Sequence, residues 1–242
     1  MRSLVCVGQR VDGSIIELQD AQGFQSSRRD PEAAKYLADE AFIESDAPEI
    51  RAEAEIAVRG ATGIRERAER LTRYVNALLE KKPTVSLPSA REVLRTKVGD
   101  CNEHTVLYVA MARALGIPAR ISVGVVFVHG AFYYHAWPEV YIADDESPNA
   151  RGMWLPVDPT LNEFPADATH LRLARGGLDK QTAILPLIGK LKMTVLEVDV
   201  VPNSTPILVG RQPADLGALA IPIPRRESAC CVCPTGGATT KR

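Results

Sequence analysis

The sequence lacks the features that would place it at once with nucleic-acid-binding or membrane proteins. Its 29 Lys and Arg residues nearly balance 30 Asp and Glu residues, so it has no basic excess with which to attract a phosphate backbone. No apolar run approaches the roughly 18 residues that a membrane span requires. The apolar stretch at the N-terminus is too short for the core of a signal peptide. We therefore expect no nucleic-acid partner, no membrane contact and a cytoplasmic location.

A disulfide framework is also missing from the pattern. The chain has only five cysteines, which is an odd number. Its 242 residues are enough to bury a core without disulfide bonds. The cysteines are Cys6, Cys101, Cys230, Cys231 and Cys233. With 24% charged and 45% hydrophobic residues, the composition is that of an ordinary globular domain. The remaining question is whether any single cysteine carries chemistry.

Helical signals occupy the first half of the chain. Asp46 with Glu49, and Ser89 with Glu92, have the spacing of a capping box, and they predict helices that end at Gly60 and before Gly99. An apolar face at three- and four-residue spacing predicts another helix near residues 64–81. A fourth helix begins around Cys101 and ends at Gly116, which places Cys101 in its first turn.

Strand signals follow the helices. Alternating apolar residues predict strands over 119–128, 133–142 and 153–158, and a strand-like run lies at 191–201. The first thirty residues predict one or two further strands and a linker. Helices followed by a block of strands favour an α+β fold over an alternating parallel sheet.

Cys101 is placed where a thiol can become a nucleophile. The first turn of a helix offers unpaired N–H groups and a partial positive charge, which favour the thiolate and lower a thiol pKa from about 8.5 to roughly 3.5–7.5. A lone cysteine is more often a small buried hydrophobic residue than a nucleophile. Catalysis therefore requires a histidine and an orienting third group.

Among the four histidines, His135 is the best candidate base, because it lies at the start of an aromatic-rich strand. The helix N-terminus disfavours an imidazolium at His104, while His129 in a turn and His170 in a later loop are expected at the surface. Asp158 ends the following strand, and two adjacent antiparallel strands can bring such ends together. An Asp before Pro can equally be a turn residue.

Four blocks in order resemble the transglutaminase-like superfamily of papain-like thiol enzymes. They are Gly99 to His104, Ala114 to Arg120, His135 to Val140 and Trp154 to Thr160, and the similarity spans about residues 45–175. A further stretch, Ala168 to Leu171, also resembles bacterial members of the superfamily. The resemblance implies a papain-like α+β core in which the Cys helix packs on an antiparallel sheet. It also implies a triad with Cys101 as nucleophile, His135 as general base and acid, and Asp158 orienting His135.

The resemblance further implies a thioester enzyme acting on amide bonds of peptides or proteins. We favour hydrolysis. The alternative is amine transfer to protein glutamine residues, which would use the same catalytic residues. We expect no cofactor and no metal. Trp137 is either a cleft wall or a core residue, Glu103 and Glu139 are supporting or solvated charges, and the loop from Asp144 to Glu146 is a solvated turn rather than a cation site.

Two hypotheses other than an acyl-transfer enzyme stay open. One is a zinc protein, with Cys101-x-x-His104 as a half-site and the C-terminal cysteines as further ligands, although no pair has ordinary zinc-ligand spacing. The other is an interaction module that has lost its chemistry. We expect three segments: a strand-like segment at residues 1–30, a transglutaminase-like catalytic domain at 31–203, and an extension with a flexible tail at 204–242.

Overall fold

The computed structural model describes most of the chain up to residue 198. The described residues are 5–6, 8–83, 89–145, 150–176, 184–187, 190–198 and 220–221. The C-terminal cysteines, Cys230, Cys231 and Cys233, lie outside these ranges. Among the described residues, no helix combines the length and the apolar character needed to cross a membrane.

Four α-helices lie where the sequence predicts helices. They are α1 (Pro48–Ala57), α2 (Ile64–Leu78), α3 (Ala90–Thr96) and α4 (Cys101–Ala114). The N-cap of α1 is Ala47 rather than the expected Asp46, and Ser89 is the N-cap of α3 but does not form the expected capping box, because its side chain makes no capping bond. The Ser89 hydroxyl donates instead to the carboxylate of Glu44. Short 3₁₀ turns occur at Ala21–Gly23, Ala33–Leu37 and Leu185–Leu187.

The main sheet is antiparallel and has β7 near its centre. Its path is β10 (Ala220–Ile221), β7 (Ala131–Ala143), β6 (Ala119–Val128) and β9 (His170–Arg175), while β8 (Gly152–Pro156) pairs with the other end of β7. A small sheet at the N-terminus contains β1 (Val5–Cys6), β2 (Gln9–Asp12) and β3 (Ile15–Leu18). The short strands β4 (Glu80–Lys81) and β5 (Val98–Gly99) pair in parallel.

Two expectations about strands are wrong. Residues 170–175, expected as a loop around His170, form β9 along β6. Residues 191–198, expected as a strand, have no helix or strand, and the last residues of that predicted run are outside the described part of the chain.

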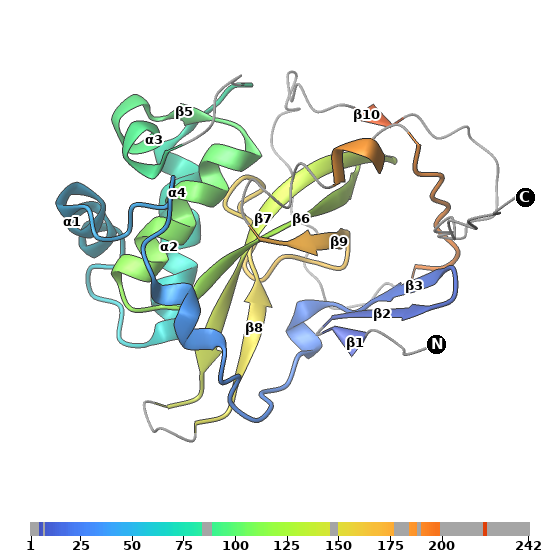
Figure 1. Cartoon of the computed structure of the whole chain (residues 1–242), viewed down its shortest axis with the longest axis horizontal. Coiled ribbons are helices and arrows are strands. Elements are labelled where there is room, and N and C mark those ends of the chain that lie inside the picture. The colour runs from blue at the N-terminus through green and yellow to red at the C-terminus, as the bar shows by residue number, and fades with distance from the viewer. Residues whose placement is uncertain are drawn as a thin grey trace, which may run out of the picture.

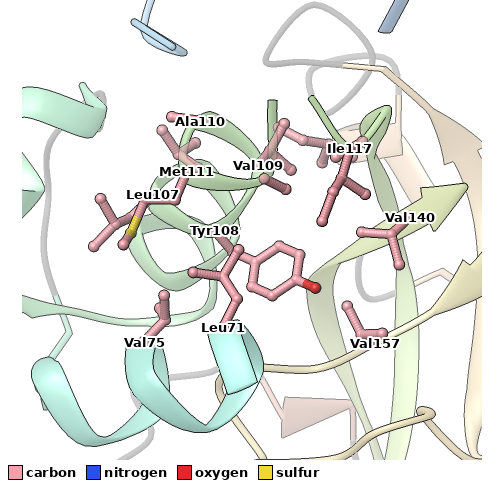
Figure 2. Close-up of a cluster of buried hydrophobic side chains, with 14 of the residues drawn as sticks. Leu71, Val75, Leu107, Tyr108, Val109, Ala110, Met111, Ile117, Val140 and Val157 are labelled. Atoms are coloured by element: carbon pink, nitrogen blue, oxygen red, sulfur yellow. The ribbon is translucent and has the colours of Figure 1, made fainter. Parts of the chain in front are cut away.

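The core lies between the sheet and the helices, which gather on one side of the molecule (Figure 1). Helix α4 is buried from Glu103 to Arg113, because it packs against α1, α2 and α3 as well as against β6 and β7. Figure 2 shows Tyr108 of α4 in the middle of this core, between Leu71 of α2 and Val140 of β7. The Tyr108 hydroxyl donates to the Ala68 carbonyl at 3.0 Å, which satisfies its buried polar atom.

The N-terminal sheet is attached to the main sheet through a side chain. The Gln9 amide donates to the Arg172 carbonyl and accepts from the Arg172 N–H, each at 3.0 Å. These two bonds imitate strand pairing along the edge of β9. The domain limits at residues 30 and 203 stay predictions, and within the expected extension only Ala220 and Ile221 are described, paired with β7.

Candidate active site

Cys101 is the first residue of α4, as the sequence predicts. Asp100 is the N-cap: its carboxylate accepts from the N–H groups of Asn102 and Glu103, and the Glu103 carboxylate accepts from the Asp100 N–H at 2.9 Å. This is a capping box, which fixes the start of the helix and buries Glu103 in the process. The Cys101 N–H is not one of the groups that the cap uses.

The surroundings of the thiol oppose its ionisation. Burial raises the pKa of the Cys101 thiol, and the carboxylate of Asp100 raises it further, whereas a hydrogen bond from the Ala136 backbone N–H lowers it. The expectation of a lowered thiol pKa is therefore wrong for this arrangement, because burial and the neighbouring acid outweigh the helix N-terminus. The thiol is protonated near neutral pH and needs a base before it can attack.

His135 and Asp158 are in direct contact. The Nε2 atom of His135 lies 2.7 Å from Oδ2 of Asp158. Strand β8 pairs with β7 so that Pro156 lies opposite Glu139, and the chain beyond Pro156 then runs back toward His135. The predicted meeting of two antiparallel strand ends is confirmed for these two residues. Ala136, the neighbour of His135, contacts Cys101, so the three predicted residues share one region.

Asp158 is fully buried and remains ionised. Burial alone would raise the pKa of this carboxyl group, but the charge and hydrogen bond of His135 and the hydrogen bond of His170 hold it well below its usual value. Its second oxygen, Oδ1, accepts from the backbone N–H groups of Thr160 at 2.7 Å and Leu161 at 3.0 Å. The carboxylate is thus held from both sides.

His170, expected at the surface, is buried in this site. Its Nε2 atom lies 3.1 Å from the same Asp158 oxygen that His135 contacts. The alternation of Leu171 and Leu173 with Arg172 indicates a strand starting at His170, and this signal could have found the residue.

Trp137 is a core residue that also borders the site. It is only 1% exposed, and its ring lies 6.0 Å from that of His135 and 5.1 Å from that of His170. Of the two roles left open for Trp137, burial in the core is the one observed.

The other two histidines lie apart from this contact. His104 is buried, its Nδ1 atom lies 2.6 Å from the Asp100 carbonyl, and burial lowers its pKa, so it is neutral. His129 is exposed in the turn between β6 and β7, as expected.

Neither Cys101 nor His104, the zinc half-site left open by the sequence, belongs to a cluster of possible metal ligands among the described residues. Among the described residues, the groups whose ligand atoms converge are His135, Asp158 and His170, and Glu163, Asp167 and His170. Neither contains Cys101 or His104. In the acidic loop, Asp144 accepts a hydrogen bond from the Ser26 hydroxyl, while Glu146 lies outside the described residues.

Glu139 is buried rather than solvated. Its carboxylate pairs with Arg120 at 2.7 Å, Arg172 at 2.5 Å and Arg175 at 2.9 Å. Burial would raise its pKa, but the three guanidinium groups lower it to about 2.

A surface hollow of about 590 Å³ between α1 and α3 is lined by none of the residues of the site.

Comparison with known protein families finds one matching family model. Residues 51–159 match the model of the transglutaminase-like superfamily, a segment that contains Cys101, His135 and Asp158 and stops before His170. None of the curated proteins matches the sequence.

Two solved structures are similar to part of this chain, and the first of them shares its fold. One is a "Putative Cysteine Protease" from Cytophaga hutchinsonii, with 23% identity, a TM-score of 0.50, and coverage of 61% of this chain and 48% of that one. Another is the periplasmic domain of TgpA from Pseudomonas aeruginosa, with 23% identity, a TM-score of 0.41, and coverage of 55% of this chain and 49% of that one. The chain thus spans about half the length of these structures. The expected α+β architecture of helices on an antiparallel sheet is confirmed, and residues 51–159 are similar to the transglutaminase-like superfamily.

Proposed function

We propose that the chain is a thiol-dependent acyl-transfer enzyme that cleaves amide bonds of peptides or proteins through a thioester on Cys101. The observation that carries the proposal is the buried contact between His135 and Asp158, at 2.7 Å, beside a cysteine at a helix start. An ionised carboxylate on one imidazole nitrogen fixes the tautomer that leaves the other nitrogen free to accept a proton. The match of residues 51–159 to the transglutaminase-like superfamily supports the same class of chemistry.

In the first half-reaction, His135 acts as the base. Because Asp158 occupies Nε2, Nδ1 is the atom that takes the thiol proton while Sγ of Cys101 attacks the carbonyl carbon. The new S–C bond forms a tetrahedral intermediate with a negative oxygen. When this intermediate collapses, the C–N bond breaks and the proton on Nδ1 passes to the leaving amine.

The Cys101 backbone N–H is a donor for the negative oxygen of the intermediate. The capping box uses the N–H groups of Asp100, Asn102 and Glu103, and the Cys101 N–H is outside that set. Such a donor is worth about 10²–10³ in rate when it is aimed at developing charge.

In the second half-reaction, water resolves the thioester. His135 removes a proton from water as the water oxygen attacks the thioester carbon; the S–C bond then breaks, and the proton on Nδ1 passes to Sγ to return the thiol. Hydrolysis is the reaction we favour, because water needs no second binding site. An amine in place of water would give the cross-linking reaction with the same residues.

The experiment is a screen of peptides with and without an added amine donor, read by mass spectrometry. We expect cleavage or deamidation products that disappear in Cys101→Ser and persist in Cys233→Ser, the matched control. Products joined to the amine donor would show that an amine, rather than water, resolves the thioester. Products formed equally by Cys101→Ser would refute the thiol mechanism and leave the fold as an interaction module or a different enzyme.

A further inference from the structure

The residues that follow Asp158 form a closed turn. The Asp158 N–H donates to the Glu163 carbonyl at 2.9 Å, and the Glu163 N–H donates to the Asp158 carbonyl at 2.8 Å. Inside the turn, Oδ1 of Asp158 accepts from the N–H groups of Thr160 at 2.7 Å and Leu161 at 3.0 Å. Oδ2 of the same carboxylate lies 2.7 Å from Nε2 of His135. The direction in which Asp158 presents Oδ2 to His135 therefore depends on the backbone of residues 159–161.

Asn76 of α2 binds the backbone of this turn. Its side chain donates from Nδ2 to the Pro159 carbonyl at 2.7 Å and to the Thr160 carbonyl at 3.1 Å. Because a carbonyl only accepts hydrogen bonds, these two partners identify the NH₂ end of the Asn76 amide. A helix that carries none of the three triad residues thus makes two hydrogen bonds to the turn of Asp158.

The two carbonyls belong to the same peptide units as the two N–H groups that hold Asp158. The Pro159 carbonyl and the Thr160 N–H form one planar unit, and the Thr160 carbonyl and the Leu161 N–H form the next. Because a trans peptide unit is rigid, a partner that fixes its oxygen also fixes the direction of its N–H. A bond to the oxygen also polarises the unit and strengthens the bond that its N–H donates. Asn76 therefore acts on both backbone donors of Asp158 at once.

Helix α2 is a firm support for Asn76. Val75, the neighbour of Asn76 in sequence, is buried in the core together with Leu71. Arg73, one turn earlier on α2, donates to the backbone carbonyl of Asn162 and, at 3.1 Å, to its side-chain oxygen. Side chains of one helix thus hold three carbonyls of one turn, and core packing sets the position of that helix.

We propose that Asn76 is a positioning residue of the thiol mechanism, which orients the peptide units 159–160 and 160–161 and through them the carboxylate of Asp158. This inference rests on the proposed function, because it requires that Asp158 orients His135. A displacement of about 1 Å caused far from the reacting atoms can lower a rate about 10²-fold, so a support of this kind has a measurable effect.

The test is the rate of thioester formation in the full chain. A p-nitrophenyl ester is the probe, and the initial release of p-nitrophenol gives the maximal acylation rate and the half-saturating ester concentration. Asn76→Ala removes both bonds, and Asn76→Asp keeps the shape of the side chain but has no N–H to donate. We expect the maximal rate to fall about 10–100-fold in both variants. The half-saturating concentration should stay within about twofold of the wild type, because only the orientation of Asp158 changes.

Ile50→Val is the matched control for a loss of stability. Ile50 is fully buried on α1, and the exchange opens a small cavity there. The folded Ile50→Val variant is expected to acylate at the wild-type rate. An equal fall in this control and in the Asn76 variants would show a general effect of lower stability and would overturn the inference.

Hydrogen exchange, read by NMR, reports on the turn directly. In the wild-type chain, we expect the N–H groups of Thr160 and Leu161 to be protected. In Asn76→Ala both should exchange at least about tenfold faster, while the N–H of Leu107 in α4 keeps its wild-type rate. If neither Asn76 variant folds, the wild-type measurement decides: protection at both positions supports the inference, and unprotected N–H groups overturn it.

The outcomes separate this inference from the proposed function. If Cys101→Ser or His135→Ala releases p-nitrophenol as fast as the wild type, the proposed function is wrong. If release depends on both residues but the folded Asn76 variants keep the wild-type maximal rate, only the role of Asn76 is wrong. A lower maximal rate in the Asn76 variants, with faster exchange at Thr160 and Leu161, supports both.

Discussion

At the scale of single residues, Asp158 is the most constrained group of the site. It is buried, accepts bonds from two imidazoles and two backbone N–H groups, and keeps its charge because those donors outweigh the cost of burial. In the proposed mechanism, Asp158 orients His135 without taking part in proton transfer itself.

The exchange Asp158→Asn tests this role. An amide in place of the carboxylate either turns its NH₂ group toward the two histidine N–H groups or forces a different tautomer on His135. By analogy with the same exchange in other triads, we expect the rate of thioester formation to fall by about 10²–10⁴-fold. Acylation by an activated ester, followed by mass spectrometry, measures this rate.

Asp144→Asn is the matched control, since Asp144 is exposed and lies in a loop. Its acylation rate is expected to equal that of the wild type. An Asp158→Asn variant that folds and acylates at the wild-type rate would remove Asp158 from the mechanism.

Sequence reasoning proposed three residues of the candidate site and wrongly expected His170 at the surface. Cys101, His135 and Asp158 were accessible because each follows or ends an element with a strong local signal, and their order matches a known family. His170 was assigned to a loop because the polar run before it hides the start of β9. The raised thiol pKa was not accessible at all, because it depends on how closely the sheet packs on Cys101.

At the scale of elements, the site depends on how closely β9 approaches β6. Gly124 of β6 lies opposite His135 on one side and Arg172 on the other. A Cβ atom at Gly124 would collide with the backbone carbonyl of Leu171, the neighbour of His170. Glycine is therefore required here by space rather than by backbone dihedral angles.

Gly124→Ala is expected to push β9 away from β6 and to destabilise the fold by more than about 2 kcal/mol, because backbone atoms cannot yield as a side chain can. Urea unfolding measures the change. Gly63→Ala is the control: nothing lies within 4 Å of the added Cβ, and a loss of less than about 1 kcal/mol is expected. Equal stability of the two variants would contradict the close packing of β9.

The helices were predictable and the caps less so. Local signals located all four α-helices: capping-box spacing for α1 and α3, apolar spacing for α2, and the stop at Gly116 for α4. Ser89 has the spacing of a capping residue but bonds to Glu44, which is 45 residues away in sequence. Such a competing partner exists only after the chain has folded.

At the scale of the whole molecule, Glu139 joins three strands of the sheet through buried charges. Its partners are Arg120 of β6 and Arg172 and Arg175 of β9. Because the folded pKa of Glu139 is lowered to about 2, its stabilising effect is present above the unfolded value near 4.5 and is lost as the pH falls toward 2.

Glu139→Gln is expected to lower the free energy of unfolding at neutral pH by about 3–5 kcal/mol, since it leaves three guanidinium groups around an uncharged side chain. It should also remove part of the loss of stability between about pH 4.5 and 2. Chemical denaturation at several pH values measures both effects. Glu32→Gln, at an exposed ion pair with Lys35, should change stability by less than about 1 kcal/mol. An equally small effect at Glu139 would show that the cluster contributes little.

The central claim is that Cys101, activated by His135, forms a thioester, and the most direct measurement is to trap that species. The full chain is mixed with a p-nitrophenyl ester and quenched in acid, and peptide mapping locates the acyl group. The account predicts a hydroxylamine-sensitive acyl group on Cys101 that forms at least about tenfold more slowly in His135→Ala. Acylation spread over the other cysteines, or a rate at Cys101 that does not depend on His135, would contradict it.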